Sequence, residues 1–350
     1  METHWTPDAV LMQFGLAASV GEPTVFLHEE YEDGYFKHII GVTTADDRRL
    51  VLKFVHEFFD GELAELSVQR DVLEKKCAFA SFLRENGILT PNYYQTDGHF
   101  CIETICMGVP CTVTVEDYCG EEIREITEPL AFRIGALVAK IHTLSLAHGY
   151  RIGCGTLFSA AEKNDVDCMD RFRTLAASEG IDPSLSMQIG TWIDRKRAML
   201  TSEWDTLPKS AVQGDISVNN LIDTPNELLV FDYNNAGDVV LVSDLVLEGL
   251  LTAYEMDLPE NTPASVREQL FPAFLNGYLS VRELTEAEQR IGWEIYTLYH
   301  ALWFSRIVYN EGSLEKLLQH GDLEGANTLL RRILDDITEQ NDGRFARRPA

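Results

Sequence analysis

Two short polar segments in the second half of the chain carry the side chains best suited to chemistry. The first reads VQGDISVNNL over residues 212–221, and the second reads FDYNNAGD over residues 231–238. Asp215 and Asn220 stand five positions apart, and Asp232 follows twelve positions after Asn220. A turn needs only one or two such residues, so this concentration of carboxylate and amide oxygens predicts a functional site. Oxygens of this kind are the ligands that a hard cation such as Mg²⁺ prefers.

A lysine far upstream supplies the opposite charge. Lys53 lies in the apolar run LVLKFV, where a lysine alone is most often a strand residue that faces solvent. Kinases that transfer a phosphoryl group from ATP use their parts in a set order along the chain. This order is a strand Lys, a loop Asp, an Asn five positions further on, and a second Asp after a strand. In this interpretation Asp215 orients the acceptor hydroxyl, while Asn220 and Asp232 bind Mg²⁺. The plain alternative is a β-hairpin with polar turns.

The elements that must position these side chains change in character along the chain. Residues 22–55 predict three strands separated by the turns EDG and ADDRR, and a helix follows up to Gly87. NYYQTDGHFCIETI predicts another hairpin. Beyond residue 104 helical patterns dominate, beginning with a helix capped by Thr127, and two short strands are expected beside the polar segments. The prediction is therefore an α+β fold, with a small antiparallel β lobe and one main helix over residues 1–103 and a larger, mostly helical lobe over residues 104–350.

On these motifs the chain resembles the aminoglycoside phosphotransferase and choline kinase family, which has the bilobal protein-kinase fold. The catalytic loop of that family reads roughly H-G-D-x4-N, and QGDISVNN matches it except at Gln213. The resemblance implies that Asp215 is the catalytic base and that Asn220 and Asp232 hold Mg²⁺. It also implies that Lys53 binds the α- and β-phosphates of ATP.

The resemblance spans roughly residues 25–310 and implies further site residues. Lys53 would pair with a glutamate of the helix that follows it; Glu74 is the first choice, with Glu65 or Glu62 as alternatives. The backbone from Glu103 to Ile105, in CIETICMG, would be the hinge between the lobes that contacts adenine.

Some positions are implied to be structural, and two depart from the family pattern. His142 and Asp244 would be buried scaffold residues, with Asp244 tying down the loop. Gln213 replaces a histidine whose main role is scaffolding, so its amide is expected to form hydrogen bonds in the same place. The loop that would cover the phosphates has only Gly34 and lacks a G-x-G-x-x-G pattern.

Composition narrows the choice of partners. The 350 residues carry a formal net charge of −27, which repels nucleic acid and would attract a cationic small molecule, although acidity for solubility alone explains it equally well. Seven cysteines without a CxxC pair indicate free thiols in a reducing compartment. We found no signal-peptide pattern and no apolar run of membrane-spanning length, so a cytoplasmic protein without a membrane partner is expected. The oligomeric state is not predicted.

Three functions fit these observations. The first is an ATP-dependent phosphotransferase acting on a hydroxyl of a small molecule, with an aminoglycoside or related amino-sugar preferred. The second is the same chemistry on a metabolite such as homoserine, choline or a sugar, and the third is a pseudokinase. Carboxylates that could line a pocket for amines, unless they are solvated helix faces, are Glu116, Asp117, Glu121, Glu122, Glu125, Glu128, Glu255, Asp257 and Glu260. A row of aromatic residues is more typical of a helix core than of a cation cage, namely Trp293, Tyr296, Tyr299, Trp303 and Phe304.

Overall fold

A computed structural model describes residues 6–59, 62–156, 168–254 and 264–339. The chain forms two compact units, and both are assembled from separate segments. The first unit comprises Met1–Ile123, Ile152–Cys154 and Val218–Gly237. The second unit comprises Arg124–Arg151, Gly155–Ser217 and Asp238–Ala350. Asn220 and Asp232 thus belong to the same unit as Lys53, whereas Asp215 belongs to the second unit.

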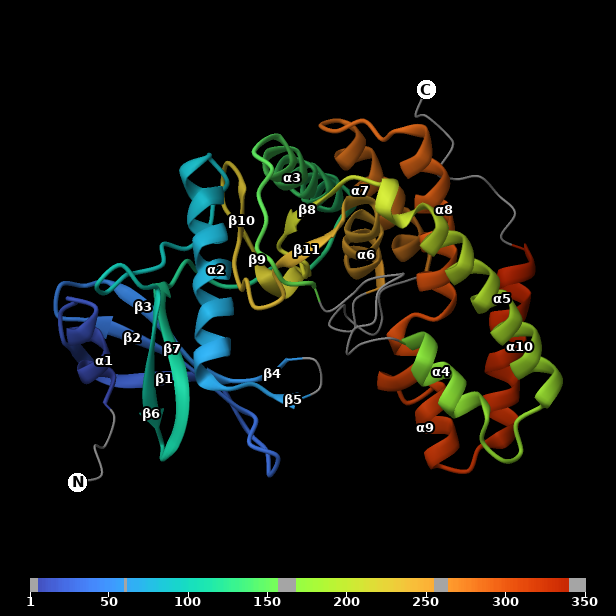
Figure 1. The fold of residues 1–350 in the computed structure, drawn as a ribbon, viewed down its shortest axis with the longest axis horizontal. Helices are drawn as coiled ribbons and strands as arrows, with labels where there is room; N and C mark the ends of the chain where they lie inside the picture. Colours follow the sequence, from blue (N-terminus) through green and yellow to red (C-terminus); the bar gives the residue numbers. More distant parts are fainter. Residues whose placement is uncertain (1–5, 60–61, 157–167, 255–263, 340–350) are drawn as a thin grey trace. The chain divides into compact units, whose positions relative to one another are not determined.

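A five-stranded antiparallel sheet forms the framework of the first unit (Figure 1). Its order is β1-β2-β3-β7-β6, and the three strands predicted over residues 22–55 are confirmed as β1, β2 and β3. The elements of this unit are α1 (Pro7–Gln13), β1 (Ser19–Glu30), β2 (Phe36–Thr44), β3 (Arg49–His56), β4 (Phe58–Phe59), β5 (Glu62–Leu63), α2 (Leu66–Glu85), β6 (Cys101–Cys106), β7 (Val109–Asp117), the short helix η2 (Val218–Asn220), β9 (Leu221–Asp223) and β10 (Leu228–Val230).

The two faces of this sheet have different roles. Alternate residues of β3, including Leu52 and Phe54, join α1 in an apolar core on one face. Because successive strand side chains point to opposite faces, Lys53 and Val55 lie on the other face, where Val55 packs with Leu73 of α2. The pleat therefore turns Lys53 toward the α2 side of the sheet and not toward solvent, and the residue is only 7% exposed.

The β6–β7 hairpin differs from the predicted division of the chain. The turn between the two strands falls at Met107 and Gly108, which have φ values of 53° and 91°. β6 pairs with β7 along its whole length, so the predicted boundary at residue 103 lies inside a strand. The first unit instead continues past Asp117 to Ile123, because the hairpin completes the sheet before the chain leaves it. In the predicted hairpin before it, Asp97 and Gly98 do form a tight turn, but the paired bridge there is limited to Thr96 and His99.

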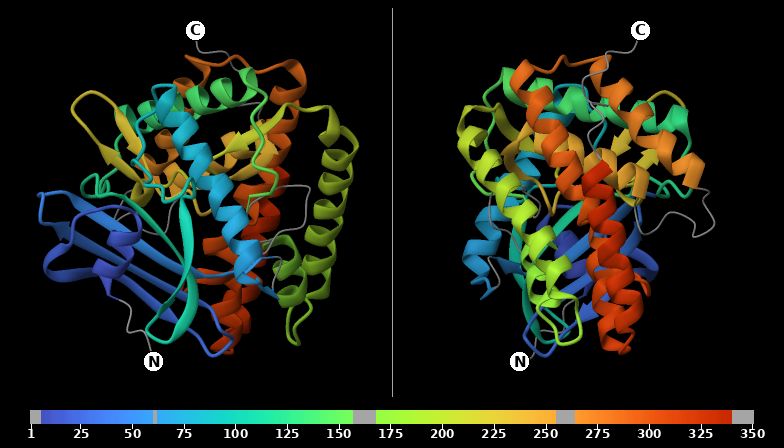
Figure 2. Two further views of the ribbon diagram at one scale, coloured as in Figure 1. Left: turned by 60° about the vertical axis from the view of Figure 1, so that its left-hand side comes forward. Right: turned by 90° about the vertical axis from the view of Figure 1, so that its right-hand side faces the viewer.

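The second unit is mainly helical, as the sequence predicted, with β8 and β11 forming a two-stranded sheet. Figure 2 shows two of its long helices, α5 and α10, running side by side, and they are in contact. Its elements are α3 (Glu128–Ala147), α4 (Cys168–Ala176), α5 (Pro183–Glu203), the short helix η1 (Trp204–Thr206), β8 (Lys209–Val212), β11 (Gly237–Val240), α6 (Leu241–Tyr254), α7 (Ala264–Leu279), α8 (Glu286–Ala301), the π-helical turn η3 (Ser305–Tyr309), α9 (Leu314–Gln319) and α10 (Leu323–Glu339).

Helix α3 is the central helix of the second unit. The Thr127 hydroxyl accepts a hydrogen bond from the Leu130 amide, which confirms the predicted cap. By length and composition α3 meets the requirements for crossing a membrane, unlike the sequence expectation. Its apolar residues are largely buried against α6, α7 and β8, which is typical of a core helix.

Candidate active site

Lys53 lies between two carboxylates of the first unit. Its ammonium nitrogen is 3.0 Å from Oε1 of Glu116 and 3.7 Å from Oδ1 of Asp232. Glu116 is 2% exposed, so this ion pair is almost fully removed from water. Such a pair is stable only when its geometry compensates the lost hydration, and here one cation faces two anions. The structure thus brings together two residues predicted from the sequence, Lys53 and Asp232, and adds Glu116.

The expected pairing of Lys53 with Glu74 is wrong. Both carboxylate oxygens of Glu74 instead accept hydrogen bonds from the amides of Phe100 and Cys101, each at 3.0 Å, at the start of β6. The alternative Glu65 is exposed at the N-terminus of α2, and the side chain of Glu62 lies outside the described residues. Among the described residues, the ion pairs of Lys53 run to Glu116 and Asp232.

The sheet register explains why Glu116 reaches Lys53. Lys53 is directly opposite Thr114, and Glu116 is two positions further along β7, on the same face of the sheet. Such diagonal neighbours lie within reach of long side chains. From the sequence, Glu116 is one of the carboxylates that could line a pocket for amines, because the sequence alone does not show how β3 and β7 pair. In the alternating pattern CTVTVED, Glu116 shares a face with Thr112 and Thr114, and a glutamate on that face is the signal that could have identified it.

Lys53 and Asp232 shift each other's pKa in the directions that keep both side chains ionised. Burial disfavours the ammonium of Lys53, but Asp232 and Glu116 outweigh it and raise the pKa of Lys53 above its usual value. Burial also disfavours the carboxylate of Asp232, yet Lys53 and Lys37 outweigh it and lower its pKa. Asp232 therefore remains an anion, as a ligand for a cation must.

A short hairpin brings Asn220 and Asp232 to the same end of two strands. The predicted strands beside the polar segments are confirmed as β9 and β10, which pair Leu221 with Val230. The next residues also pair, since the Phe231 amide donates to the Asn220 carbonyl at 3.1 Å. Asp232 follows with φ of 54°, an unusual conformation for a residue other than glycine, and its Oδ1 accepts from the Asn234 amide at 3.3 Å.

This arrangement fits the expected metal. An ionised carboxylate and an amide oxygen at one hairpin end are hard ligands of the type that Mg²⁺ binds. Among the described residues, no group of three His, Cys, Asp or Glu side chains forms a denser metal site. A small number of protein ligands is sufficient for Mg²⁺, because this ion usually keeps several waters and also binds substrate phosphates.

The loop that carries Asp215 is held by two hydrogen bonds within the second unit. The side-chain oxygen of Gln213 accepts from the Asp215 amide at 2.8 Å, so this glutamine forms the expected scaffold hydrogen bond. A carboxylate oxygen of Glu248, on α6, accepts from the Ile216 amide at 2.6 Å. Gln213 and Glu248 are fully buried, whereas Asp215 is half-buried. These two hydrogen bonds hold the backbone of the loop in place, while Asp215 keeps partial access to solvent.

His142 and Asp244 form a buried pair within the second unit. His142 Nε2 is 2.8 Å from an Asp244 oxygen, and its Nδ1 is 2.8 Å from the hydroxyl of Tyr278. These contacts join α3, α6 and α7, so the structural role expected for both residues is consistent with their burial. The Asp244 side chain is held by α3, although it was expected to tie down the loop itself.

The hinge expected at Glu103 to Ile105 does not lie where the chain leaves the first unit. Both residues are exposed on β6, the edge strand, opposite Thr112 and Pro110. Glu103 also forms an ion pair with Arg70 at 3.2 Å. The chain crosses to the second unit only after β7, so residues 103–105 are not the connection between the two units, and their contact with adenine stays a prediction.

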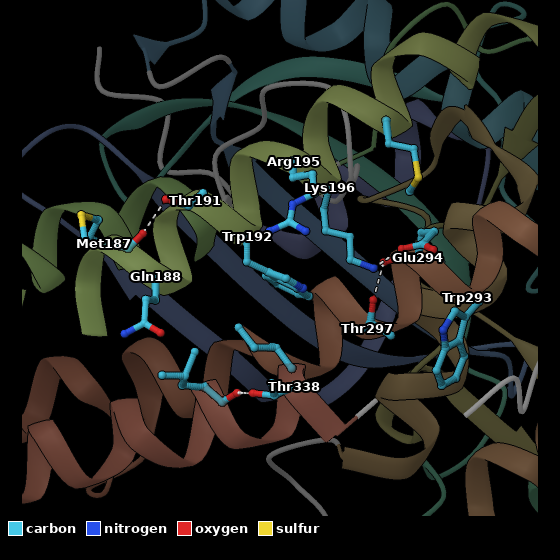
Figure 3. A pocket seen from close by; sticks show the side chains of 13 residues that line it. Met187, Gln188, Thr191, Trp192, Arg195, Lys196, Trp293, Glu294, Thr297 and Thr338 are labelled. Atoms are coloured by element: carbon cyan, nitrogen blue, oxygen red, sulfur yellow. Dashed lines mark hydrogen bonds and ion pairs between the residues drawn. The ribbon is translucent and has the colours of Figure 1, made fainter. Parts of the chain in front are cut away.

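A cavity of about 690 Å³ lies elsewhere in the second unit, between α5, α8 and α10 (Figure 3). Trp192 and Trp293 contribute to its walls, together with an ion pair between Lys196 and Glu294. None of the predicted catalytic or metal-binding residues lines it, so it is separate from the predicted chemistry.

The other residues considered for a cationic acceptor have mixed surroundings. Trp303 and Phe304 are buried, and Trp293 and Tyr296 stack at 5.6 Å, consistent with helix packing. Glu121, Glu122, Glu125 and Glu128 are exposed. Glu255, Asp257 and Glu260 lie outside the described residues.

Comparison with known proteins identifies the fold. Neither a family model nor a curated protein matches the sequence. Among solved structures, the amicoumacin kinase hAmiN, in complex with AMP-PNP, Ca²⁺ and Ami, matches with a TM-score of 0.62 and 15% identity, over 97% of this chain and 96% of that chain. A microcompartment-associated aminopropanol kinase gives a TM-score of 0.60 at 16% identity, over 95% of this chain and 100% of that chain. An aminoglycoside phosphotransferase from Alicyclobacillus acidocaldarius gives 0.53 at 13% identity, over 97% of this chain and 98% of that chain. The predicted α+β fold is therefore confirmed, and over nearly its whole length the chain has the fold of aminoglycoside phosphotransferases and related kinases.

Proposed function

We propose that this protein is an ATP-dependent phosphotransferase that moves the γ-phosphate to a hydroxyl group of a small molecule. The observation that carries the proposal is the approach of Lys53 to the Asp232 carboxylate, 3.7 Å apart on segments that are separated by about half the length of the chain. A cation beside an ionised metal ligand is the pair of charges that a Mg²⁺-bound triphosphate requires. The fold shared with known kinases supports this reading.

Each residue then has a distinct part. Lys53 binds oxygens of the triphosphate, and Glu116 holds its ammonium in place. Asn220 and Asp232 hold Mg²⁺, which when bound neutralises charge on the phosphates. Asp215 accepts a hydrogen bond from the acceptor hydroxyl, orients its oxygen toward the γ-phosphorus and takes up its proton.

For the acceptor, we propose an amino-sugar of the aminoglycoside type. The net charge of −27 favours capture of a cation. Solved structures that share this fold add support, since they include an aminoglycoside phosphotransferase and an aminopropanol kinase. An uncharged alcohol is the competing acceptor class.

Two substitutions test the division of roles. Asp215→Ala is expected to remove most turnover, by about 10²–10⁴-fold, while nucleotide affinity stays near that of the wild type. Asp232→Ala is expected to weaken binding of Mg²⁺-nucleotide as well. ADP release measured over a panel of amino-sugars and neutral alcohols, together with nucleotide titrations, reports both quantities. Equal turnover in the wild type and Asp215→Ala would refute the role of Asp215, and release only with neutral alcohols would exclude the amino-sugar.

A further inference from the structure

Helix α2 places a second buried lysine in the first unit that the proposed chemistry does not use. The helix buries one stripe of residues against the sheet, and two residues of this stripe are polar, Gln69 and Lys76. Gln69 is accounted for, since its amide donates to the Val55 carbonyl at 2.6 Å and to the Thr112 hydroxyl at 2.8 Å. Lys76 is 7% exposed, and a lysine is rarely buried without a specific partner.

One partner of Lys76 lies in the segment that carries the predicted metal ligand. Its ammonium donates to the backbone carbonyl of Asn234, two residues after Asp232. This carbonyl belongs to a tight turn in which the Ala236 amide donates to the Tyr233 carbonyl at 3.0 Å. Aromatic contacts reinforce the same turn, because the ring of Tyr233 packs edge-on against Phe79 of α2 at 6.1 Å.

The turn needs such support because its backbone is unusual. Asp232 has a left-handed φ of 54°, which costs an ordinary residue free energy and persists only when the surroundings impose it. The Asp232 side chain stabilises the turn locally by accepting from the Asn234 amide. A charged donor on the adjacent carbonyl adds a stronger hydrogen bond than a neutral donor would.

We propose that Lys76 is a positioning residue, whose ammonium fixes the turn at residues 232–236 and thereby holds the Asp232 carboxylate in the orientation that binds the metal. In this unit the helix supplies a cation to the turn, and strand β7 supplies the glutamate that holds Lys53. The claim that Lys76 fixes the turn is supported by these contacts alone, whereas the claim that it affects metal binding rests on the proposed function.

The structural part is tested by hydrogen exchange on the protein without ligands. Lys76→Met removes the ammonium and keeps an apolar side chain of similar length, and Lys75→Met is the matched control because Lys75 is the exposed neighbour on the same helix. In Lys76→Met the amides of residues 232–236 are expected to exchange roughly tenfold faster than in the wild type. Lys75→Met should leave them unchanged. Exchange within about twofold of the wild type in folded Lys76→Met would overturn the proposal.

Lys76→Gln serves as a second variant if Lys76→Met does not fold, since a shorter amide keeps a donor inside the site but cannot restore the charged hydrogen bond. It is expected to give faster exchange confined to the turn. Exchange that rises equally throughout the first unit would show a general loss of packing and would contradict a local positioning role.

The functional part is tested by titrating Mg²⁺ with a fluorescent ATP analogue. In Lys76→Met the Mg²⁺ concentration at half-saturation is expected to rise roughly tenfold, while metal-free nucleotide affinity stays within about twofold of the wild type. Loss of metal-free affinity with an unchanged Mg²⁺ requirement would mean that Lys76 contacts phosphates, and would overturn the proposal. If the wild type binds no nucleotide, the proposed function fails, and the exchange measurement still decides what Lys76 does.

Discussion

Lys53 depends on two carboxylates that reach it from different segments, Glu116 from β7 and Asp232 from the turn after β10. The pair with Glu116 is the shorter and the more buried of the two. Removing one member of a buried ion pair leaves the other charge uncompensated, which generally costs more stability than the intact pair contributes. Glu116 is therefore expected to matter both for folding and for the position of the phosphate-binding ammonium.

Glu116→Gln tests this dependence with little change in shape. Because Asp232 still faces Lys53, we expect a loss near the lower end of the range for broken buried pairs, about 3 kcal/mol in the free energy of unfolding. Glu103→Gln is the control, since Glu103 is exposed and its ion pair with Arg70 should contribute about 1 kcal/mol or less. Urea unfolding at pH 7 measures both values. Similar losses of unfolding free energy in the two variants would show that the buried pair between Lys53 and Glu116 stabilises the protein no more than an exposed ion pair does.

Asp232 gives the site a defined response to acid. Its folded-state pKa lies below the usual value, so its carboxylate stabilises the fold fully above the unfolded-state pKa, which is about 4. That contribution is lost as the pH falls through the folded-state pKa. The difference in unfolding free energy between the wild type and Asp232→Asn should therefore narrow as the pH drops below about 4. Chemical unfolding of both proteins between neutral pH and acid measures it, and a difference that is constant or grows toward acid would contradict the direction of the shift.

Whole elements were predicted from the sequence more reliably than the contacts between them. The apolar run LVLKFV and the spacing in α2 fix local structure, and the polar segments beside β9 and β10 mark the hairpin that joins Asn220 and Asp232. The partner of Lys53 could not be predicted in this way, because it depends on the register between β3 and β7, which are separated by more than fifty residues. A helix glutamate and a strand glutamate look equally suitable until that register is known. The hinge was misplaced for a related reason: only the pairing of β6 with β7 shows that Met107 and Gly108 form a hairpin turn.

The packing of α3 against α7 gives a test at the scale of elements. A Cβ atom at Gly135 of α3 would clash with the carbonyl oxygen of Phe274 on α7, and one at Gly277 would clash with that of Phe132. Backbones this close leave no room to adjust. Gly135→Ala is therefore expected to destabilise the protein by about 1–3 kcal/mol or more, despite the better helix propensity of alanine.

Gly190→Ala is the matched control for this prediction. Gly190 lies within α5, and nothing is within 4 Å of the position of an added Cβ. The same substitution should there stabilise the protein by up to about 1 kcal/mol. Thermal unfolding of the two variants separates packing from propensity, and a gain in stability at both positions would contradict the close approach of α3 and α7.

At the scale of the whole molecule, the acidic excess of 56 Asp and Glu over 29 Lys and Arg creates a field that extends beyond any single site. Such a field does not determine the fold, but it changes how often charged molecules meet the surface. It should raise the capture of a polycationic acceptor and leave a neutral alcohol unaffected. The same field opposes the approach of ATP, which is itself an anion.

Added salt separates these effects, because the screening length falls from about 10 Å at 0.1 M to about 3 Å at 1 M ionic strength. With ATP and Mg²⁺ saturating, the KM for an amino-sugar acceptor is expected to rise severalfold across this range, since capture of the cation loses its long-range attraction. The kcat should change little, because the groups that act on the bound acceptor are local. A neutral alcohol of similar size, assayed in parallel, controls for general effects of salt on the enzyme. If the KM values of the charged and neutral acceptors shift by the same factor, the acidic surface serves solubility alone and takes no part in selecting the substrate.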